Sequence, residues 1–444
     1  MWTLLNKNDL PQLLNQYPAL YNFADQEFLL HETPTHYILP RYFNKDYPTP
    51  LIFNHVDAEF KPQTIEIEST ADVRSGQKAA LKYLLDYYNQ NGNIGGLFQA
   101  SPGFGKTFSA AFLTSKLKKK TLIILDNTKL MEQWIDAYTQ FTSLEEDDIG
   151  IIQGKKFETD KPVAIAMVQT LLSKVKTDLK EWYVKIRDAG YDLVFYDEVH
   201  KTSSAGKFAT SSLLLNTLNI VGLTATPYVR GINELLLKGT IGDILYVVKD
   251  YDMTPKINFV KYDSGLGPKY KRKMHYMGDY IKKVAFHNSI ILQSEKYLDN
   301  IYRISSKCME VGHRLIIIVS TKKQVETITA MLINKGLNAR PFFSEQREVD
   351  QEDDTLLVAT SRYASAGFDY KALSALLLAC PLKGKTSVIQ TSGRVLRICK
   401  GKKQPVIFDL IDTAFDDLFI SSIKVKTNIF KSEFKTNQIV EINT

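Results

Sequence analysis

The chain has 444 residues, of which 44% are hydrophobic and 24% are charged, and its formal net charge is +7. This is the composition of an ordinary globular protein, and the length predicts two or three domains rather than one core. Since no apolar run is long enough to cross a membrane and no secretion signal opens the chain, we expect a soluble, cytoplasmic protein. The three cysteines, Cys308, Cys380 and Cys399, have neither metal-ligand spacing nor an even count, which argues against a zinc site or a disulfide framework.

The positive charge is concentrated in the body of the chain. Residues 1–70 carry a net charge of −5, so the remaining residues carry +12. An excess of this sign favours a polyanionic partner such as nucleic acid.

Taken in chain order, the predicted elements begin with short strand-like stretches among several prolines, and we expect a small accessory module over residues 1–65. Helical and strand-like patterns then alternate up to residue 248, which is typical of a parallel sheet with crossover helices. The expected helices cover residues 77–92 and 108–120, and the expected strands cover 96–100, 121–125, 163–168, 192–196 and 219–223.

A second alternating region follows a polar, lysine-containing stretch at 262–283 and a long helical segment around 284–310. Its expected strands cover 314–319, 355–359, 374–379 and 405–410. The predicted fold class is therefore α/β, with two parallel-sheet domains at 66–248 and 249–444 after the N-terminal module.

The stretch ASPGFGKT at 100–107 follows a predicted strand and opens a helix. Glycines allow backbone N–H groups to approach phosphate oxygens, a lysine adds positive charge and a threonine hydroxyl can bind Mg2+. The alternative interpretation is a flexible turn before a helix. Asp197 and Glu198 follow another buried strand, at the sheet edge where open α/β sheets bind ligands, although paired acids of this kind also cap helices or face solvent.

The order of ASPGFGKT, LDNTKLMEQW, VQTL, DEVH, TATP, TSRYASAGFD and QTSGRVLR resembles the motif series of superfamily 2 helicases and translocases of the DExH branch. The series spans about residues 74–397, and within that branch the chain is similar to phage branch-migration helicases of the UvsW type. The resemblance implies two RecA-like domains that hydrolyse ATP with Mg2+. Such motors couple hydrolysis to the closing and opening of the two domains.

The resemblance implies roles for individual residues. Phosphate and nucleotide binding falls to Gln77, Gly103, Gly105, Lys106, Thr107 and Asp369, and metal binding to Thr107 and Asp197. Catalysis falls to Lys106, to Glu198 as the base that orients water, and to Gln390, Arg394 and Arg397, whose positive charge would assist phosphoryl transfer. Coupling between the ATP site and nucleic acid falls to His200, Thr224 and Thr226.

Nucleic-acid contacts are expected from small donors on both domains, which suit phosphates better than base edges. The residues are Asn127, Thr128, Lys129, Gln169, Thr170, Ser320, Thr321, Thr360 and Ser361. Lys271, Arg272 and Lys273 lie among tyrosines in a mixture suited to phosphate attraction and base stacking, and the alternative is a flexible, solvated linker.

Together, the motifs and the resemblance favour an ATP-dependent DNA helicase or translocase that remodels branched or forked DNA in recombination, repair or replication. We expect a monomer that works with nucleic acid and with replication or recombination proteins. A duplex translocase and an RNA helicase are alternatives within the enzyme class. An ATP-switched nucleic-acid clamp or annealing factor is the alternative from another class.

Overall fold

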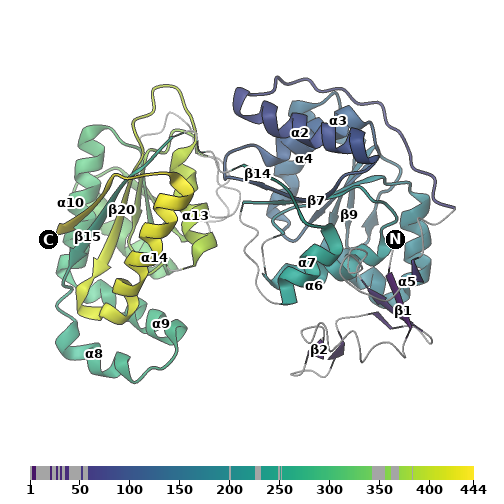
Figure 1. Ribbon diagram of the computed structural model, residues 1–444. Helices are drawn as coiled ribbons and strands as arrows, with labels where there is room; N and C mark the ends of the chain where they lie inside the picture. The colour runs from purple at the N-terminus through teal and green to yellow at the C-terminus, as the bar shows by residue number, and fades with distance from the viewer. Residues whose placement is uncertain are drawn as a thin grey trace. The chain divides into compact units, whose positions relative to one another are not determined.

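The computed structural model describes residues 59–199, 202–225, 232–248, 251, 253–342, 356–361, 370–382 and 384–444, together with short strands within residues 1–58. The chain divides into two compact units, Met1–Val248 (unit 1) and Lys249–Thr444 (unit 2). Figure 1 shows a sheet flanked by helices in each unit. None of the helices in the described ranges has the length and apolar content needed to span a bilayer.

Unit 1 is built on an eight-stranded sheet of order β10-β9-β11-β8-β12-β13-β7-β14, parallel except for the short β10. Its strands are β7 (Gly95–Ala100), β8 (Thr121–Leu125), β9 (Ile149–Gln153), β10 (Lys156–Phe157), β11 (Val163–Met167), β12 (Leu193–Tyr196), β13 (Ile220–Thr224) and β14 (Ile244–Val248). Its helices are α2 (Ser75–Asn91), α3 (Lys106–Leu117), α4 (Lys129–Phe141), α5 (Val168–Asp188), α6 (Thr202–Ser211) and α7 (Ile232–Ile241), with 3-10 turns η3 (Glu146–Asp148) and η4 (Ser212–Leu214).

The central strands of this sheet are buried on both faces, which is why they appear in the sequence as uninterrupted apolar runs. Helices α2, α3 and α4 cover one face, where Leu84, Ala110 and Tyr138 enter a core with Phe98 of β7. Helices α5, α6 and α7 cover the other face and share a second core with Ile124 of β8. This division follows from right-handed crossovers, because the connections through α3 and α4 run one way along the sheet and those through α5 to α7 run the other way.

The strands described within residues 1–58 are antiparallel and short. They are β1 (Thr3–Asn6), β2 (Tyr21–Asn22), β3 (Glu27–Phe28), β4 (His31–Glu32), β5 (His36–Leu39) and β6 (Ile52–Phe53). Strands β4, β5, β1 and β6 form one small sheet, and β2 pairs with β3.

Unit 2 is built on a seven-stranded, fully parallel sheet of order β17-β18-β16-β19-β20-β15-β21. Its strands are β15 (Lys256–Tyr262), β16 (Leu315–Val319), β17 (Ala339–Phe342), β18 (Leu356–Thr360), β19 (Ala375–Leu378), β20 (Val406–Asp412) and β21 (Ile439–Asn443). Its helices are α8 (Gly267–His275), α9 (Tyr280–Ile290), α10 (Glu295–Val311), α11 (Lys322–Asn334), α13 (Lys385–Gly393) and α14 (Asp416–Phe434), with 3-10 turns η5 (Ile291–Gln293), η6 (Arg394–Leu396) and η7 (Thr413–Phe415).

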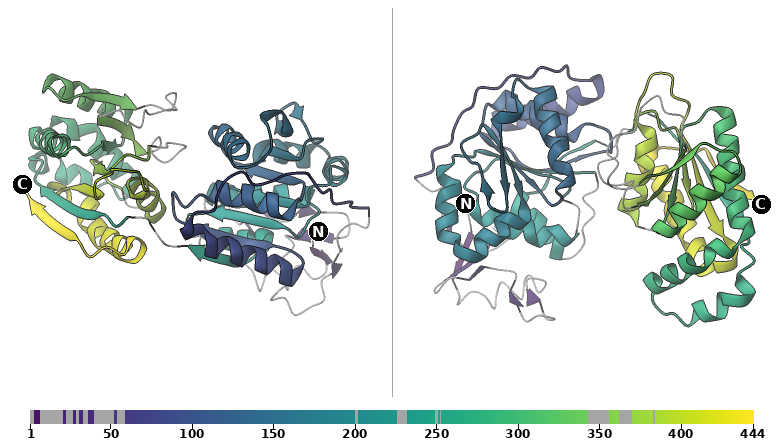
Figure 2. Two further views of the ribbon diagram at one scale, coloured as in Figure 1. Left: turned by 90° about the horizontal axis from the view of Figure 1, so that it is seen from above. Right: turned by 180° about the vertical axis from the view of Figure 1, so that it is seen from behind.

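The helices of unit 2 cover both faces of its sheet, with α13 and α14 on the face turned to the viewer in Figure 1 and α10 on the face seen from behind in Figure 2. Two sheets that are parallel apart from β10, each with crossover helices, confirm the predicted α/β fold class. The helical segment expected around 284–310 is confirmed, but it is divided into separate helices. The chain forms α9, then η5, and begins α10 anew at Ser294, whose hydroxyl accepts a hydrogen bond from the Tyr297 N–H at 3.2 Å.

Candidate nucleotide site and nucleic-acid edge

The phosphate loop lies between β7 and α3, with its two glycines in the left-handed region at the turn into the helix. Gly103 has φ +87° and Gly105 has φ +95°, and residues other than glycine rarely adopt such backbone angles. The backbone N–H groups at the start of α3 have no partners within the helix, so this end attracts anions. Lys106 is the first residue of α3, and its Nζ lies 3.5 Å from the carbonyl oxygen of Ala100. This geometry is suited to phosphate binding.

The acid pair follows β12, separated from β7 by one strand of the sheet. Asp197 is 8% exposed, and its two carboxylate oxygens accept hydrogen bonds from Trp134 Nε1 and from the Glu198 N–H, each at 2.9 Å. Burial, and then the charge of Glu198, raise the pKa of Asp197 to about 6, while the positive charge of Lys106 acts in the opposite direction. A buried carboxylate with a raised pKa is a position where a bound cation is favoured.

Glu198 has φ +52°, which is strained for a residue with a side chain. The Val199 N–H donates to Leu223 O of β13 at 3.2 Å and the Asp197 N–H donates to Ile124 O of β8 at 3.2 Å. The chain is therefore held on both sides of Glu198 by the neighbouring strands. Thr224, the last residue of β13, is fully buried beside this turn at the same edge of the sheet.

Gln77 and Arg74 contact the phosphate loop itself. Gln77 Nε2 donates to Phe104 O at 2.7 Å, and Arg74 Nη2 donates to the same oxygen at 2.6 Å. The amide oxygen of Gln77 also accepts from the Arg74 N–H at 3.2 Å, so both ends of this amide are engaged. The role of Gln77 in nucleotide binding stays a prediction, and in the structure its side chain contacts the backbone of the phosphate loop.

Two of the predicted nucleic-acid segments of unit 1 lie side by side. Gln169 Nε2, at the start of α5, donates to the main-chain and side-chain oxygens of Asp126 at 3.0 and 2.9 Å, directly before the predicted residues Asn127, Thr128 and Lys129. Thr170 is buried, and its hydroxyl accepts the Gly154 N–H at 2.9 Å. Asn127 Oδ1 accepts the Lys129 N–H at 3.1 Å at the beginning of α4.

The predicted nucleic-acid residues of unit 2 also gather at one edge of its sheet. Ser320 and Thr321 follow β16, Thr360 ends β18, and the two strands pair with Val319 opposite Thr360. Thr321 caps α11 by accepting the Gln324 N–H at 3.2 Å, and Gln324 Oε1 accepts the N–H of Ser320 at 2.9 Å. Ser361 directly follows β18 and is partly exposed.

The predicted arginines lie in unit 2 away from these residues along the chain. Gln390 is in α13, Arg394 opens η6, and Arg397 follows it on the connection that leads back to the start of β20; all three are partly buried. Their contact with a nucleotide stays a prediction. His200, Thr226 and Asp369 lie outside the described residues.

Lys271, Arg272 and Lys273 lie on an ordered helix, α8, with their side chains exposed, so the linker alternative is wrong for this part of the stretch. The sequence analysis missed three residues that contribute to the two sites. Trp134 donates a hydrogen bond to Asp197, and Gln324 contacts Thr321. Asp126 accepts hydrogen bonds from Gln169 and, at 3.1 Å, from Lys207 Nζ. A tryptophan on the buried face of α4 needs a partner for its N–H, but the pattern alone does not say which one.

A phosphate loop, a buried acid pair at the same sheet edge and a second parallel-sheet unit define a phosphate-loop nucleotide-binding protein with tandem RecA-like domains. The family model described as "Type III restriction enzyme, res subunit" matches residues 70–229. The chain is 23% identical to "Probable helicase D10" of Escherichia phage T5, over 71% of this chain and 67% of that protein. It is 24% identical to "Transcript termination protein A18" of Yaba-like disease virus, over 77% of this chain and 71% of that protein.

Solved structures show the same fold. The ATP-dependent Type ISP restriction-modification enzyme LlaBIII bound to DNA matches 94% of this chain and 33% of its own length, with a TM-score of 0.58 and 13% identity. Dbp5 of S. cerevisiae bound to RNA and ADP BeF3 matches 83% of this chain and 92% of its own length, with a TM-score of 0.52 and 12% identity. T4 UvsW also matches, but at a TM-score of 0.32 that supports no argument.

These relationships confirm the resemblance to superfamily 2 helicases: residues 70–229 match the family model, and the chain is similar in sequence to a phage protein named as a helicase.

Proposed function

We propose that this chain is an ATP-driven motor that unwinds or migrates branched or forked DNA. The observation that carries the proposal is the pairing, within unit 1, of a phosphate loop and acid pair with a second group of donors at the carboxyl ends of β8 and β11. Because β8 and β12 are neighbours in one parallel sheet, both groups are attached to the same rigid element. A change at the phosphates can therefore be transmitted to the nucleic-acid residues.

The residues around the phosphate loop fit ATP with Mg2+. Thr107 and Asp197 would hold the cation, which would neutralise charge on the phosphates. Lys106 supplies positive charge beside the loop, and Glu198 orients the attacking water as its general base. The raised pKa of Asp197 has burial as its main cause, and that is the penalty a bound cation would relieve.

Unit 2 supplies the remaining groups in this proposal. Arg394 and Arg397 stabilise the negative charge that develops on the transferred phosphoryl group, and Gln390 accompanies them. Ser320, Thr321, Thr360 and Ser361 grip the nucleic-acid backbone from the carboxyl edge of the unit 2 sheet. Two units that hold one backbone and alternate with each ATP cycle would produce stepwise movement.

Turnover and unwinding on matched substrates test the proposal. ATP hydrolysis is measured with single-stranded DNA, linear duplex, a four-way junction and RNA of the same sequence, and strand displacement is followed with fluorescent labels. The expected result is strongest stimulation and ATP-dependent displacement on the junction. Stimulation by duplex without displacement would indicate a duplex translocase, preference for RNA an RNA helicase, and binding without stimulated turnover a clamp or annealing factor.

Lys106→Ala provides the decisive variant, with Lys116→Ala on the same helix as its matched control. Loss of ATP-driven displacement with retained DNA binding is expected for Lys106→Ala, and near wild-type behaviour for Lys116→Ala. Retained displacement by Lys106→Ala would remove the phosphate loop from the mechanism.

A further inference from the structure

We propose that the helical hairpin α8–α9 (residues 265–290, the arm) is a nucleic-acid contact that stacks an unpaired base at a duplex end on Tyr276. This inference rests on the proposed function and extends it to an element outside the ATP site and the motif residues. Four observations support it: the charge of the arm, the exposed ring at its tip, its position in the sheet topology and its anchoring.

The arm is basic along its length. It contains six Lys or Arg residues and a single carboxylate, Asp279. Asp279 caps α9, and its carboxylate accepts a hydrogen bond from the Ile281 N–H at 2.8 Å within the turn between the two helices. The six basic residues are Lys269, Lys271, Arg272, Lys273, Lys282 and Lys283. A positive surface of this kind attracts the phosphate backbone irrespective of sequence.

The tip of the arm carries large apolar groups in water. Tyr276, which directly follows α8, is 75% exposed, and Ile281 at the start of α9 is 74% exposed. Residues three and four apart share a helix face, so Lys269, Arg272 and Tyr276 form one stripe along α8. An exposed aromatic ring at the end of a row of cations combines phosphate attraction with a stacking surface, which is how proteins hold unpaired bases.

The arm leaves the sheet at the edge where the nucleic-acid residues of unit 2 lie. It follows the carboxyl end of β15, and in a fully parallel sheet that end shares an edge with the carboxyl ends of β16 and β18. A hydrogen bond also joins the arm to this edge. Gln324 Nε2 donates to the carbonyl oxygen of Asn288, in α9, at 3.2 Å. Gln324 is the residue whose backbone N–H Thr321 caps. The base of the arm is thus attached to the residues of unit 2 that are predicted to bind the nucleic-acid backbone.

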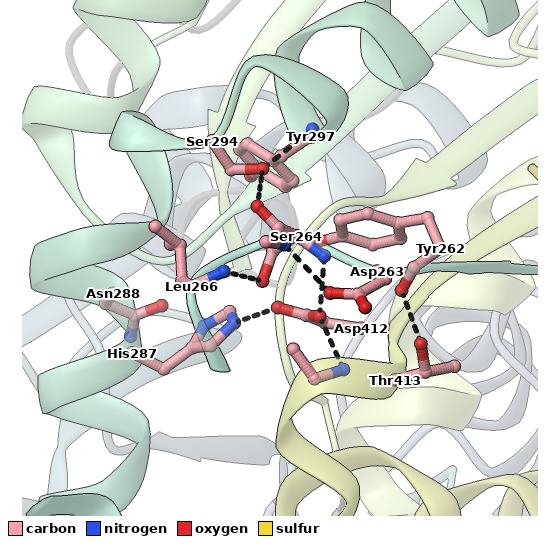
Figure 3. A network of polar contacts seen from close by, with 12 residues as sticks. Tyr262, Asp263, Ser264, Leu266, His287, Asn288, Ser294, Tyr297, Asp412 and Thr413 are labelled. Atoms are coloured by element: carbon pink, nitrogen blue, oxygen red, sulfur yellow. Dashed lines mark hydrogen bonds and ion pairs between the residues drawn. The ribbon is translucent and has the colours of Figure 1, made fainter. Parts of the chain in front are cut away.

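Figure 3 shows how the base of the arm is fixed to the sheet. His287 of α9 and Asp412 at the end of β20 are both buried and lie 3.3 Å apart between Nε2 and Oδ2. The other oxygen of Asp412 accepts the N–H groups of Ser264 at 3.2 Å and Ala414 at 3.0 Å. Ser294, which caps α10, donates to Ser264 O at 2.8 Å.

Ring packing joins the two helices of the arm. Tyr270 of α8 meets Phe286 of α9 edge to face, with centroids 5.7 Å apart, and its hydroxyl donates to Gln293 Oε1 at 3.2 Å. Met274 of α8 is 2% exposed and belongs to the hydrophobic core of unit 2. An arm fixed in this way belongs to the same unit as Thr321 and Thr360, so one unit would bind both a base stacked on Tyr276 and the backbone held at that edge.

The test compares a fluorescein-labelled DNA fork with single-stranded arms and a blunt duplex of the same sequence, using the full-length protein and fluorescence anisotropy. Tyr276→Ala is expected to weaken fork binding by about fivefold or more, because stacking of one base is worth about 1–3 kcal/mol. Blunt-duplex binding is expected to change by less than about twofold. A 2-aminopurine placed at the first unpaired position should be quenched by the wild-type protein and not by Tyr276→Ala.

A triple variant tests the charge of the arm separately. Lys269→Gln, Arg272→Gln and Lys273→Gln together should weaken binding to both DNAs and flatten its salt dependence. The matched control is the same change at Lys296, Arg303 and Lys307, an equivalent set of exposed cations on α10. Thermal unfolding must be the same for all variants.

The outcomes separate the two proposals. If the wild-type protein neither binds DNA nor hydrolyses ATP in response to it, the proposed function fails. If the wild-type protein does both, yet Tyr276→Ala binds the fork as tightly as wild type, or loses fork and duplex binding equally, the role of the arm is refuted.

Discussion

Trp134→Phe removes the hydrogen bond that the indole N–H donates to Asp197, and it should shift the pH dependence of ATP hydrolysis. The bond is 2.9 Å long and buried, since Trp134 is 1% exposed and Asp197 8% exposed. A hydrogen bond to a charged group contributes about 1.5–3 kcal/mol. Because a difference of 1.36 kcal/mol corresponds to one pKa unit, the pKa of Asp197 should rise by about one to two units.

The sign follows from which form the indole stabilises. The N–H donor favours the charged carboxylate, so its loss favours the protonated form. The pKa of Asp197 begins at about 6, and an acid that titrates one to two units higher is substantially protonated at neutral pH. At pH 7, kcat/KM should therefore fall by about two- to tenfold and recover near pH 9.

The assay is steady-state turnover of MgATP from pH 5 to pH 9.5, since kcat/KM reports the free enzyme. Tyr138→Phe is the matched control, because Tyr138 is on the same helix, is fully buried and bonds Thr114 Oγ1 at 2.9 Å, away from the acid pair. An acidic limb at the same pH in wild type, Trp134→Phe and Tyr138→Phe would refute the assigned role of Trp134.

Three further changes have expected outcomes. Gly105→Ala should reduce nucleotide affinity, measured with a fluorescent ATP analogue, because a Cβ there would lie 2.6 Å from Gln77 Nε2; Gly154→Ala, also at positive φ but with nothing within 4 Å, is the control. Arg397→Ala should abolish ATP turnover with an unchanged melting temperature, and a destabilised variant would count against a catalytic role. Lys426→Met should destabilise the protein by about 3–5 kcal/mol in calorimetry, because its buried partner Asp409, 2.7 Å away, is left charged. Since burial already raises the pKa of Asp409, that cost should shrink as the pH falls, while exposed Lys424→Met should have little effect at any pH.

The sequence predicted best those elements whose signal is local. The strand expected at 121–125 is β8, with the same bounds, because a fully buried parallel strand appears as a continuous apolar run between turn residues. The phosphate loop and the acid pair were found for a similar reason, since each consists of adjacent residues at the end of such a strand. Strands β14 and β21 were not predicted, and both lie at sheet edges, where burial is incomplete. In β21 the apolar run is also interrupted by Glu441, so it lacks the continuous pattern of a buried strand.

Contacts between distant residues could not be read from patterns. Trp134 and Asp197 are separated by 63 positions, and only the fold brings their side chains together. Helix α8 was not predicted for a related reason. Its sequence is polar and lysine-rich, and the helix is held by buried Met274 and by the contacts of its base with the rest of unit 2, which no local propensity reveals.

The strand order of each sheet has a consequence for biosynthesis. In unit 2 the first strand, β15, lies between β20 and β21, and in unit 1 the strand of the phosphate loop, β7, lies between β13 and β14. In each unit the two neighbours of this early strand are the last strands to be synthesised. Until they leave the ribosome, both hydrogen-bonding edges of the early strand stay unpaired. A nascent chain stalled before β21 would carry an open edge on β15, and such products should be the ones that chaperones hold and proteases remove.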